Sequence, residues 1–264
     1  MRTVVDTVPT FVLVLAVVGL VVGLVLTAVW AVRRFVPATR EGFDAEVSSQ
    51  MLGVVASLFG LLLAFVVVIE FQAFSAAGDT VGTEADGLAA ITRDSRSFDG
   101  RGGEAVRAAI GVYLRAVVNE EWALMRKGND SQAAWDAMNG LFAAMQAATP
   151  TAGAQQSFYD DSVRRLNVVL DARRDRLVAI SDSDLPLVIA ALIVVGSVVI
   201  LGYVTLVGSR SVAFHMIGAG SIAVVVGFSL VVLVLLQFPF SGGLAVDAKP
   251  FGEGALAPLL AGTK

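Results

Sequence analysis

The chain has no cysteine and only one histidine, His215, among its 264 residues. The lack of cysteine excludes disulfides, thiolate catalysis and cysteine-ligated metal sites, and it leaves the redox compartment open. A single histidine makes neither a catalytic triad nor a zinc site, so we interpret His215 as a packing residue. Walker and dinucleotide-binding motifs are also absent. We therefore expect a protein that is not an enzyme and that holds no cofactor or metal.

Charged residues are scarce as well. They make up 16% of the chain, whereas hydrophobic residues make up 56%. This balance is too apolar for a water-soluble domain of ordinary composition, so it predicts a membrane protein. The net charge is −4 and no basic stripe is present, which argues against binding to nucleic acid.

The apolar residues form four blocks, each near the ~20 residues that a helix needs to cross a bilayer. They lie at about 8–32, 51–69, 186–207 and 213–240. We expect the first block to be a retained helix, because it is longer than the apolar core of a signal peptide. The third block follows the helix-start signal Ser183-Asp184-Leu185-Pro186. Only a short connection at Gly208-Ser209-Arg210 separates it from the fourth, so these two blocks predict an antiparallel hairpin.

Most charges lie in the long stretch 70–184, which holds 17 acidic and 12 basic residues. This stretch is rich in alanine, and its breaks predict helices at about 70–97, 104–127, 131–148 and 153–181. The fold class is therefore an all-α membrane protein with four transmembrane helices and an extramembrane helical domain inserted between the second and third. The predicted parts are 1–69 (two spans), 70–184 (helical domain), 185–240 (hairpin) and 241–264 (tail).

No proline or polar loop separates the second block from the helix after it, so we expect one long helix through Glu70. The tail, rich in Gly, Ala and Pro, either lies loosely on the surface or folds back under Phe240 and Phe251.

Residue spacing gives the second block two faces. A small-residue face suited to close helix packing consists of Gly53, Ala56, Ser57, Gly60 and Ala64. A bulky face consists of Phe59, Leu63, Val67 and Glu70. Both faces are compatible with ordinary packing inside the membrane. The functional alternative is that the bulky face of several copies surrounds a pore, with Glu70 at its mouth.

Arg173 lies on the apolar stripe of the 153–181 helix, while Arg174 and Arg176 are expected to point elsewhere. A buried guanidinium needs an acid, and Glu84 or Glu121 would form such an ion pair inside the helical domain. The alternative is a solvated helix end, with the arginine stem covering apolar surface.

The order of these features resembles the bestrophin-like membrane family, long catalogued as a domain of unknown function. The matching residues are Leu63-Ala64-Phe65-Val66-Val67, Glu84-Ala85, Tyr113 with Glu121-Trp122, Ala172 to Leu177, and the turn Pro239-Phe240-Ser241-Gly242. One departure is Gln237, where the family pattern tends to have an acid.

The resemblance implies an oligomeric ion channel, pentameric as in bestrophins, with a narrow apolar neck on the second span. Phe59, Leu63 and Val67 would form that neck, and a ring of Glu70 would favour cations. The implied partners are the lipid bilayer, other copies of the chain and ions, and the implied location is the plasma membrane with a cytosolic helical domain. The alternative function is a non-conducting membrane scaffold or signalling protein whose helical domain binds a partner.

Overall fold

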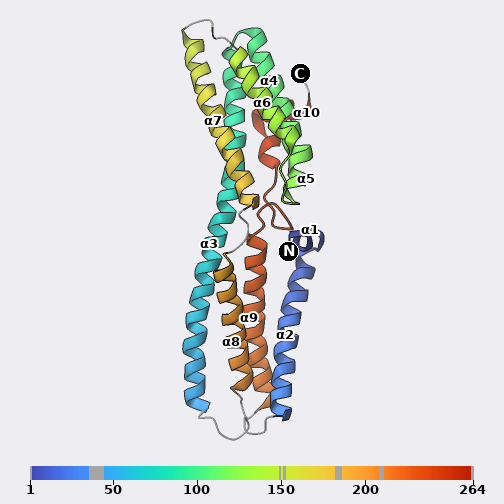
Figure 1. The fold of residues 1–264 in the computed structure, drawn as a ribbon, viewed down its shortest axis with the longest axis vertical. Helices are drawn as coiled ribbons and strands as arrows, with labels where there is room; N and C mark the ends of the chain where they lie inside the picture. Colours follow the sequence, from blue (N-terminus) through green and yellow to red (C-terminus); the bar gives the residue numbers. More distant parts are fainter. Residues whose placement is uncertain are drawn as a thin grey trace. The chain divides into compact units, whose positions relative to one another are not determined.

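The computed structural model describes residues 2–35, 45–148, 150, 153–181, 186–207 and 211–262. Every regular element in these ranges is a helix, which confirms the all-α fold (Figure 1). The helix start predicted from residues 183–185, the boundary predicted at 184/185 and the connection predicted at 208–210 lie outside the described residues.

Four helices are long and apolar enough to cross a membrane, as the sequence predicts. They are α2 (Thr10–Phe35), α3 (Ala45–Asp94), α8 (Leu187–Leu206) and α9 (Val212–Leu236). α9 stops at Leu236, before the predicted end at residue 240. Pro239 explains the difference, because it has no backbone N–H and disfavours a helical conformation at the residue before it.

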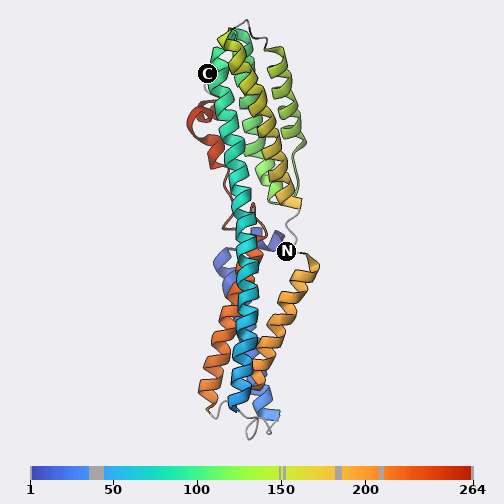
Figure 2. The ribbon, with the colours of Figure 1, turned by 90° about the vertical axis from the view of Figure 1, so that its left-hand side faces the viewer.

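α3 is one unbroken helix of 50 residues. It continues through Glu70, as expected from the lack of a loop signal there, and it contains both Gly78 and Gly82. Figure 2 shows this helix along its whole length.

The chain divides into two compact units, each assembled from separate stretches. The first unit comprises Met1–Asp6, Phe74–Ser183 and Phe238–Lys264, and the second comprises Thr7–Ala73 and Asp184–Gln237. α3 contributes its C-terminal part to the first unit and its N-terminal part to the second.

The second unit contains α2, α8, α9 and the first part of α3. Val25 and Val29 of α2 pack against Ala219 and Ala223 of α9. The backbones approach closely at Gly227, where an added Cβ would lie 3.3 Å from Val18 Cα. This pair of helices forms the best-packed part of the unit.

The first unit is a helical bundle around the second part of α3. Its other helices are α4 (Gly100–Ala116), the π-helical turn η3 (Val117–Glu121), α5 (Trp122–Met125), α6 (Gln132–Ala147) and α7 (Ala154–Ser181). A short 3₁₀ turn, η2 (Ser95–Ser97), links α3 to α4. The core is built from Leu88 and Ile91 of α3, Ile110 of α4, Leu141 of α6 and Val169 of α7.

The caps in the first unit follow from the local sequence. Asp99 accepts a hydrogen bond from Gly100 N at the start of α4, and Ser131 accepts one from Ala134 N at the start of α6. Both side chains satisfy backbone N–H groups that have no partner within the helix.

The tail folds back onto the first unit. Its short helices are η4 (Lys249–Gly252), η5 (Gly254–Leu256) and α10 (Ala257–Ala261). Phe251 and Leu256 are buried in the core, and Arg115 of α4 donates a hydrogen bond to the Leu259 carbonyl at 3.0 Å. Of the two arrangements that the sequence left open, the described residues show the folded one.

Candidate functional site

The bulky face of α3 packs inside the second unit. Leu63 is only 7% exposed and lies in a cluster with Ile193 of α8 and Leu233 of α9. Phe59 and Val67 pack against the same cluster. The Phe59 ring lies so close to Gly196 of α8 that an added Cβ there would overlap it. The three residues that the sequence favours for a pore neck therefore contact helices of their own chain.

The small-residue face of α3 is left open by the described residues of its own chain. Gly53, Ser57, Gly60 and Ala64 are exposed, whereas Ala56 is half-buried. A Cβ added at Gly53 or Gly60 would meet no atom within 4 Å. This surface is free to approach another helix.

Large apolar side chains flank the small ones on the exposed side of α3. Leu58, Leu61 and Phe65 are 65%, 56% and 61% exposed. At roughly 100° per residue, their mean direction lies about a quarter turn from that of the small residues. One side of α3 thus exposes large apolar side chains, and the side next to it has small residues that permit another helix to approach closely.

Glu70 is half-buried and lies on the same side of α3 as Leu63 and Val67. Its carboxylate forms no ion pair with any residue in the described ranges. Among the residues that the structure describes, this acid therefore has no neutralising cation.

Four charged residues form a buried network in the first unit. Glu84 of α3, Glu121 of η3, and Arg173 and Arg176 of α7 are all fully buried. Two positive and two negative charges balance, so the set carries no net charge when all four are ionised.

Arg173 and Glu121 form one pair in this network. Arg173 Nη2 lies 2.5 Å from Glu121 Oε1, and Arg173 Nε lies 3.5 Å from Oε2. The Arg173 guanidinium carbon also lies 4.0 Å from the ring centroid of Trp135. Arg173 Nη1 has no hydrogen-bond partner among the described residues, so ring stacking is its main compensation.

Arg176 joins the two acids. Its Nε donates to Glu84 Oε2 at 2.8 Å, and its Nη2 donates to Glu84 Oε1 at 3.1 Å and Glu121 Oε2 at 3.0 Å. Its Nη1 lies 2.7 Å from Met125 Sδ. Burial is the largest single influence and lowers the pKa of this guanidinium, but its acidic neighbours, Glu84 foremost, together outweigh burial and the pKa lies above its ordinary range.

The Tyr113 hydroxyl completes the network by donating to Glu84. Tyr113 is fully buried. Burial raises the pKa of its phenol well above the ordinary value of 10.0, and the neighbouring Glu84 charge acts in the same direction. The phenol therefore remains a neutral donor.

The π-helical turn η3 places two neighbouring acids in different roles. Glu121 points to the arginines, while Glu120 accepts a hydrogen bond from Ser131 Oγ at 2.7 Å. The wider i→i+5 turn is a rare form that occurs often at sites of special function. Here it joins the network to the cap of α6, because Ser131 also caps that helix.

Sequence reasoning found only part of this network. The sequence predicts an ion pair of Arg173 with Glu84 or Glu121. In the structure Arg173 pairs with Glu121, and Glu84 pairs with Arg176. Arg176 was expected to point away from the core, and that expectation is wrong because the residue is buried. Its spacing of three from Arg173 was the available signal, since residues three apart share a helix face.

The turn after α9 also lies in the first unit. Phe240 is buried and meets the Trp122 ring edge to face, with centroids 5.8 Å apart. Pro239 accepts a hydrogen bond from Val246 N at 2.7 Å, and Gly242 has a positive φ of 83°. Within the described residues, no group of three or more His, Asp or Glu side chains could hold a metal ion.

All members of the network are sealed from solvent, so its evident role is to hold α3, η3 and α7 together. We expect Arg176→Met to lower the free energy of unfolding by about 3–5 kcal/mol, because it leaves buried carboxylate charge without its cation. Arg174→Met is the matched control: Arg174 lies 3.8 Å from Asp171 at the surface, and its loss should cost less than about 0.5 kcal/mol. Denaturation in detergent measures both, and equal losses would contradict the buried network.

Tyr113 predicts a dependence of stability on alkaline pH. Its pKa is raised in the folded state, so its contribution is complete below the unfolded value of about 10 and is lost as pH rises beyond it. One proton changes the slope by at most about 1.4 kcal/mol per pH unit. Above about pH 10, the melting temperature should therefore decrease more steeply with pH for the wild type than for Tyr113→Phe. If the melting temperatures of the two proteins decreased equally with pH, the pKa of Tyr113 would not be raised by folding.

Comparison with known proteins agrees with the sequence pattern. The family model described as the Bestrophin-like domain matches residues 19–251, which is most of the chain. The match includes α3 and all four charged residues of the buried network. A search of curated proteins gives no match. The chain belongs to the bestrophin-like family.

Proposed function

We propose that this protein is an oligomeric ion channel of the plasma membrane in which copies of α3 surround the ion path. Four apolar helices and the bestrophin-like family fit a membrane protein. This family is not known as enzymatic. The observation that carries the proposal is the apolar face of α3 that its own chain leaves uncovered.

Lipid alone could cover an apolar face, and the other three apolar helices also expose large side chains. α3 carries an open stripe of Gly53, Ser57, Gly60 and Ala64 beside the bulky residues, and α2 has a shorter one at Gly19, Gly23 and Thr27. Contact with lipid has no need of small residues, whereas close approach of a second helix does. In a ring of helices each member shows one sector to the axis and a neighbouring sector to the next copy, which is the arrangement that α3 offers.

The two faces of α3 give two candidate necks. The sequence favours Phe59, Leu63 and Val67, with Glu70 on the same side. Because Phe59 and Leu63 are occupied by contacts with α8 and α9, we favour Leu58, Leu61 and Phe65 on the exposed side. Their spacing of three and four residues places them in successive turns, and apolar rings of this kind gate by dewetting.

The first unit supplies the extramembrane part of this proposal. The stretch 70–184, between the second and third spans, would be the helical domain, and it would lie in the cytosol. The parts 1–69, 185–240 and 241–264 would be the first two spans, the hairpin and the tail. A pentamer is the assembly that the proposal takes from the bestrophin relation.

Single-channel recording in planar bilayers tests the neck. Phe65→Ser should increase the open time or the current, because a polar ring keeps the constriction wet. Leu63→Ser is the matched control, and it should lower thermal stability while leaving the current of the assembled protein unchanged. If Leu63→Ser changed the current and Phe65→Ser did not, the neck would instead be formed by Phe59, Leu63 and Val67. No current from the wild type in any salt would favour the non-conducting scaffold.

Glu70 gives a separate test of which face lines the path. It lies on the side of α3 that packs inside the second unit, so Glu70→Gln should leave the reversal potential in a salt gradient unchanged. A ring of carboxylates in the ion path would instead favour cations, and its neutralisation would shift the reversal potential toward the anion value. Such a shift would support the neck that the sequence favours.

A further inference from the structure

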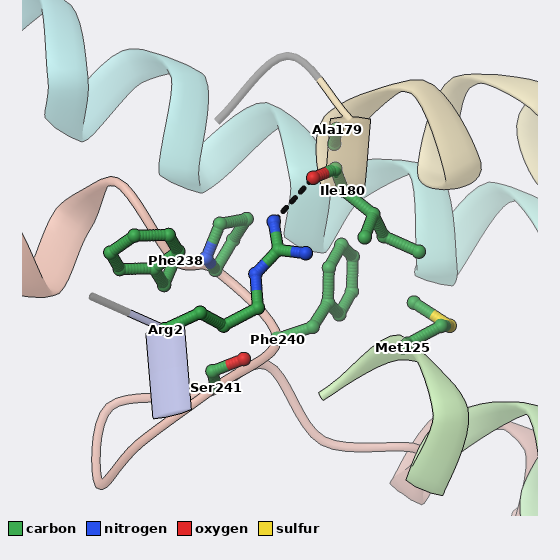
Figure 3. Close-up of a pocket in the computed structure, with 8 residues that line it drawn as sticks. Arg2, Met125, Ala179, Ile180, Phe238, Phe240 and Ser241 are labelled. Atoms are coloured by element: carbon green, nitrogen blue, oxygen red, sulfur yellow. Dashed lines mark hydrogen bonds between the residues drawn. The ribbon is translucent and has the colours of Figure 1, made fainter. Parts of the chain in front are cut away.

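We infer that Arg2 is a conformational clamp that holds together three segments of the first unit, each close in sequence to a point where the chain enters or leaves the second unit. This goes beyond the proposed channel function and does not depend on it. Arg2 belongs to α1 (Arg2–Thr7), and the other two segments are the end of α7 and the turn after α9. Figure 3 shows the Arg2 side chain among them.

The first contact of the clamp is with α7. Arg2 Nη2 donates a hydrogen bond to the carbonyl of Ile180, in the last turn of that helix. Carbonyls in a last helical turn lack intrahelical donors and carry the negative end of the helix dipole. The Arg2 guanidinium supplies both a hydrogen-bond donor for such a carbonyl and a positive charge near the negative end of the helix.

The second contact is with the turn after α9. The Arg2 guanidinium carbon lies 5.4 Å from the ring centroid of Phe238, and Arg2 lines a small pocket with Phe240 and Ser241. The same α1 segment also packs on this turn, because a Cβ at Gly242 would lie 2.8 Å from Val5 Cγ1. The positive φ of Gly242 and the absence of its side chain let Val5 reach the turn.

A third group of contacts ties the clamp to the turn after α5. Gly128 has a φ of 85°, and a Cβ there would overlap Arg2 Nη1. Ser241 Oγ donates to the Arg126 carbonyl in the same turn at 3.0 Å. The turn after α5 therefore leaves a space that fits the guanidinium.

The segments that Arg2 contacts lie next to places where the chain passes from one unit to the other. The chain passes between the units at four places: after Asp6, between Ala73 and Phe74, after Ser183, and between Gln237 and Phe238. The second place is inside the continuous α3. The first place lies near the end of α1, the third comes after α7, and the fourth precedes the turn that Arg2 contacts. Arg2 thus contacts a segment beside each of the three crossings outside α3, and its release would loosen those three segments together.

Hydrogen exchange of the full chain in detergent micelles tests the clamp. The amides of Ser241 and Val246 donate to the carbonyls of Phe238 and Pro239, so they are protected probes of the turn. Arg2→Met keeps the apolar stem but removes the charge and the donors. It should speed exchange across 238–248 and the last turn of α7 at least about fivefold, with α4 and α6 unchanged. Arg101→Met, at an exposed position, is the control and should change nothing.

Two further variants keep the test decisive. Gly128→Ala fills the space of the guanidinium, and it should loosen the same segments, with little further change when combined with Arg2→Met. Arg2→Lys keeps the charge without the planar fork and should fall between the wild type and Arg2→Met. Less than about fivefold faster exchange in Arg2→Met, or an equal increase across α4 and α6, would overturn the clamp.

Discussion

Two arginines without access to water determine how the first unit is built. A buried guanidinium is tolerated only when acids and further hydrogen bonds compensate its lost hydration. Arg173 and Arg176 of α7 obtain that compensation from Glu121 of η3 and Glu84 of α3. The three helical segments must therefore keep one register, because a shift of any of them would leave a charge unpaired. Apolar contacts around the network are less directional and would permit several registers.

The same long helix meets opposite demands in its two parts. Beyond Ala73, α3 contributes Glu84 to a polar network and Leu88 and Ile91 to a closed core. Before that point it exposes Leu61 and Phe65, which the described part of the chain leaves uncovered. Lipid alone could cover these bulky residues, but the open glycines beside them match the close approach of a second helix. The proposed channel depends on this difference between the two parts of α3: one part is buried in its own unit, and the other exposes a face to which a second copy can bind.

Much of the fold could be predicted because its signals are strong and local. Apolar runs of membrane length give the four long helices, and the lack of a break after Glu70 gives the continuity of α3. The ion pair between Arg173 and Glu121 could be anticipated because a buried arginine demands an acid. The choice between Glu84 and Glu121 could not, since it depends on the π-helical turn at η3, which leaves no clear mark in the sequence. The burial of Arg176 is not apparent from the apolar stripe of its helix; the signal for it is its position three residues after Arg173.

The orientation of α3 within the second unit was equally hidden. Periodicity divides a helix into faces, but it does not say which face meets its own chain and which meets another. Leu63 and Leu61 have the same chemistry and differ only in their direction, and the contacts with Ile193 and Leu233 decide between them. The Arg2 clamp depends on contacts between residues more than a hundred positions apart, so only the folded chain reveals it.

In the proposed assembly, the open face of α3 meets other copies of the same chain. The natural absence of cysteine allows a direct measurement by disulfide formation from a single introduced thiol. In native membranes under mild oxidation, the account predicts that Leu61→Cys forms covalent dimers, whereas Leu63→Cys remains monomeric. Cross-linking at residue 63 with none at residue 61 would contradict it.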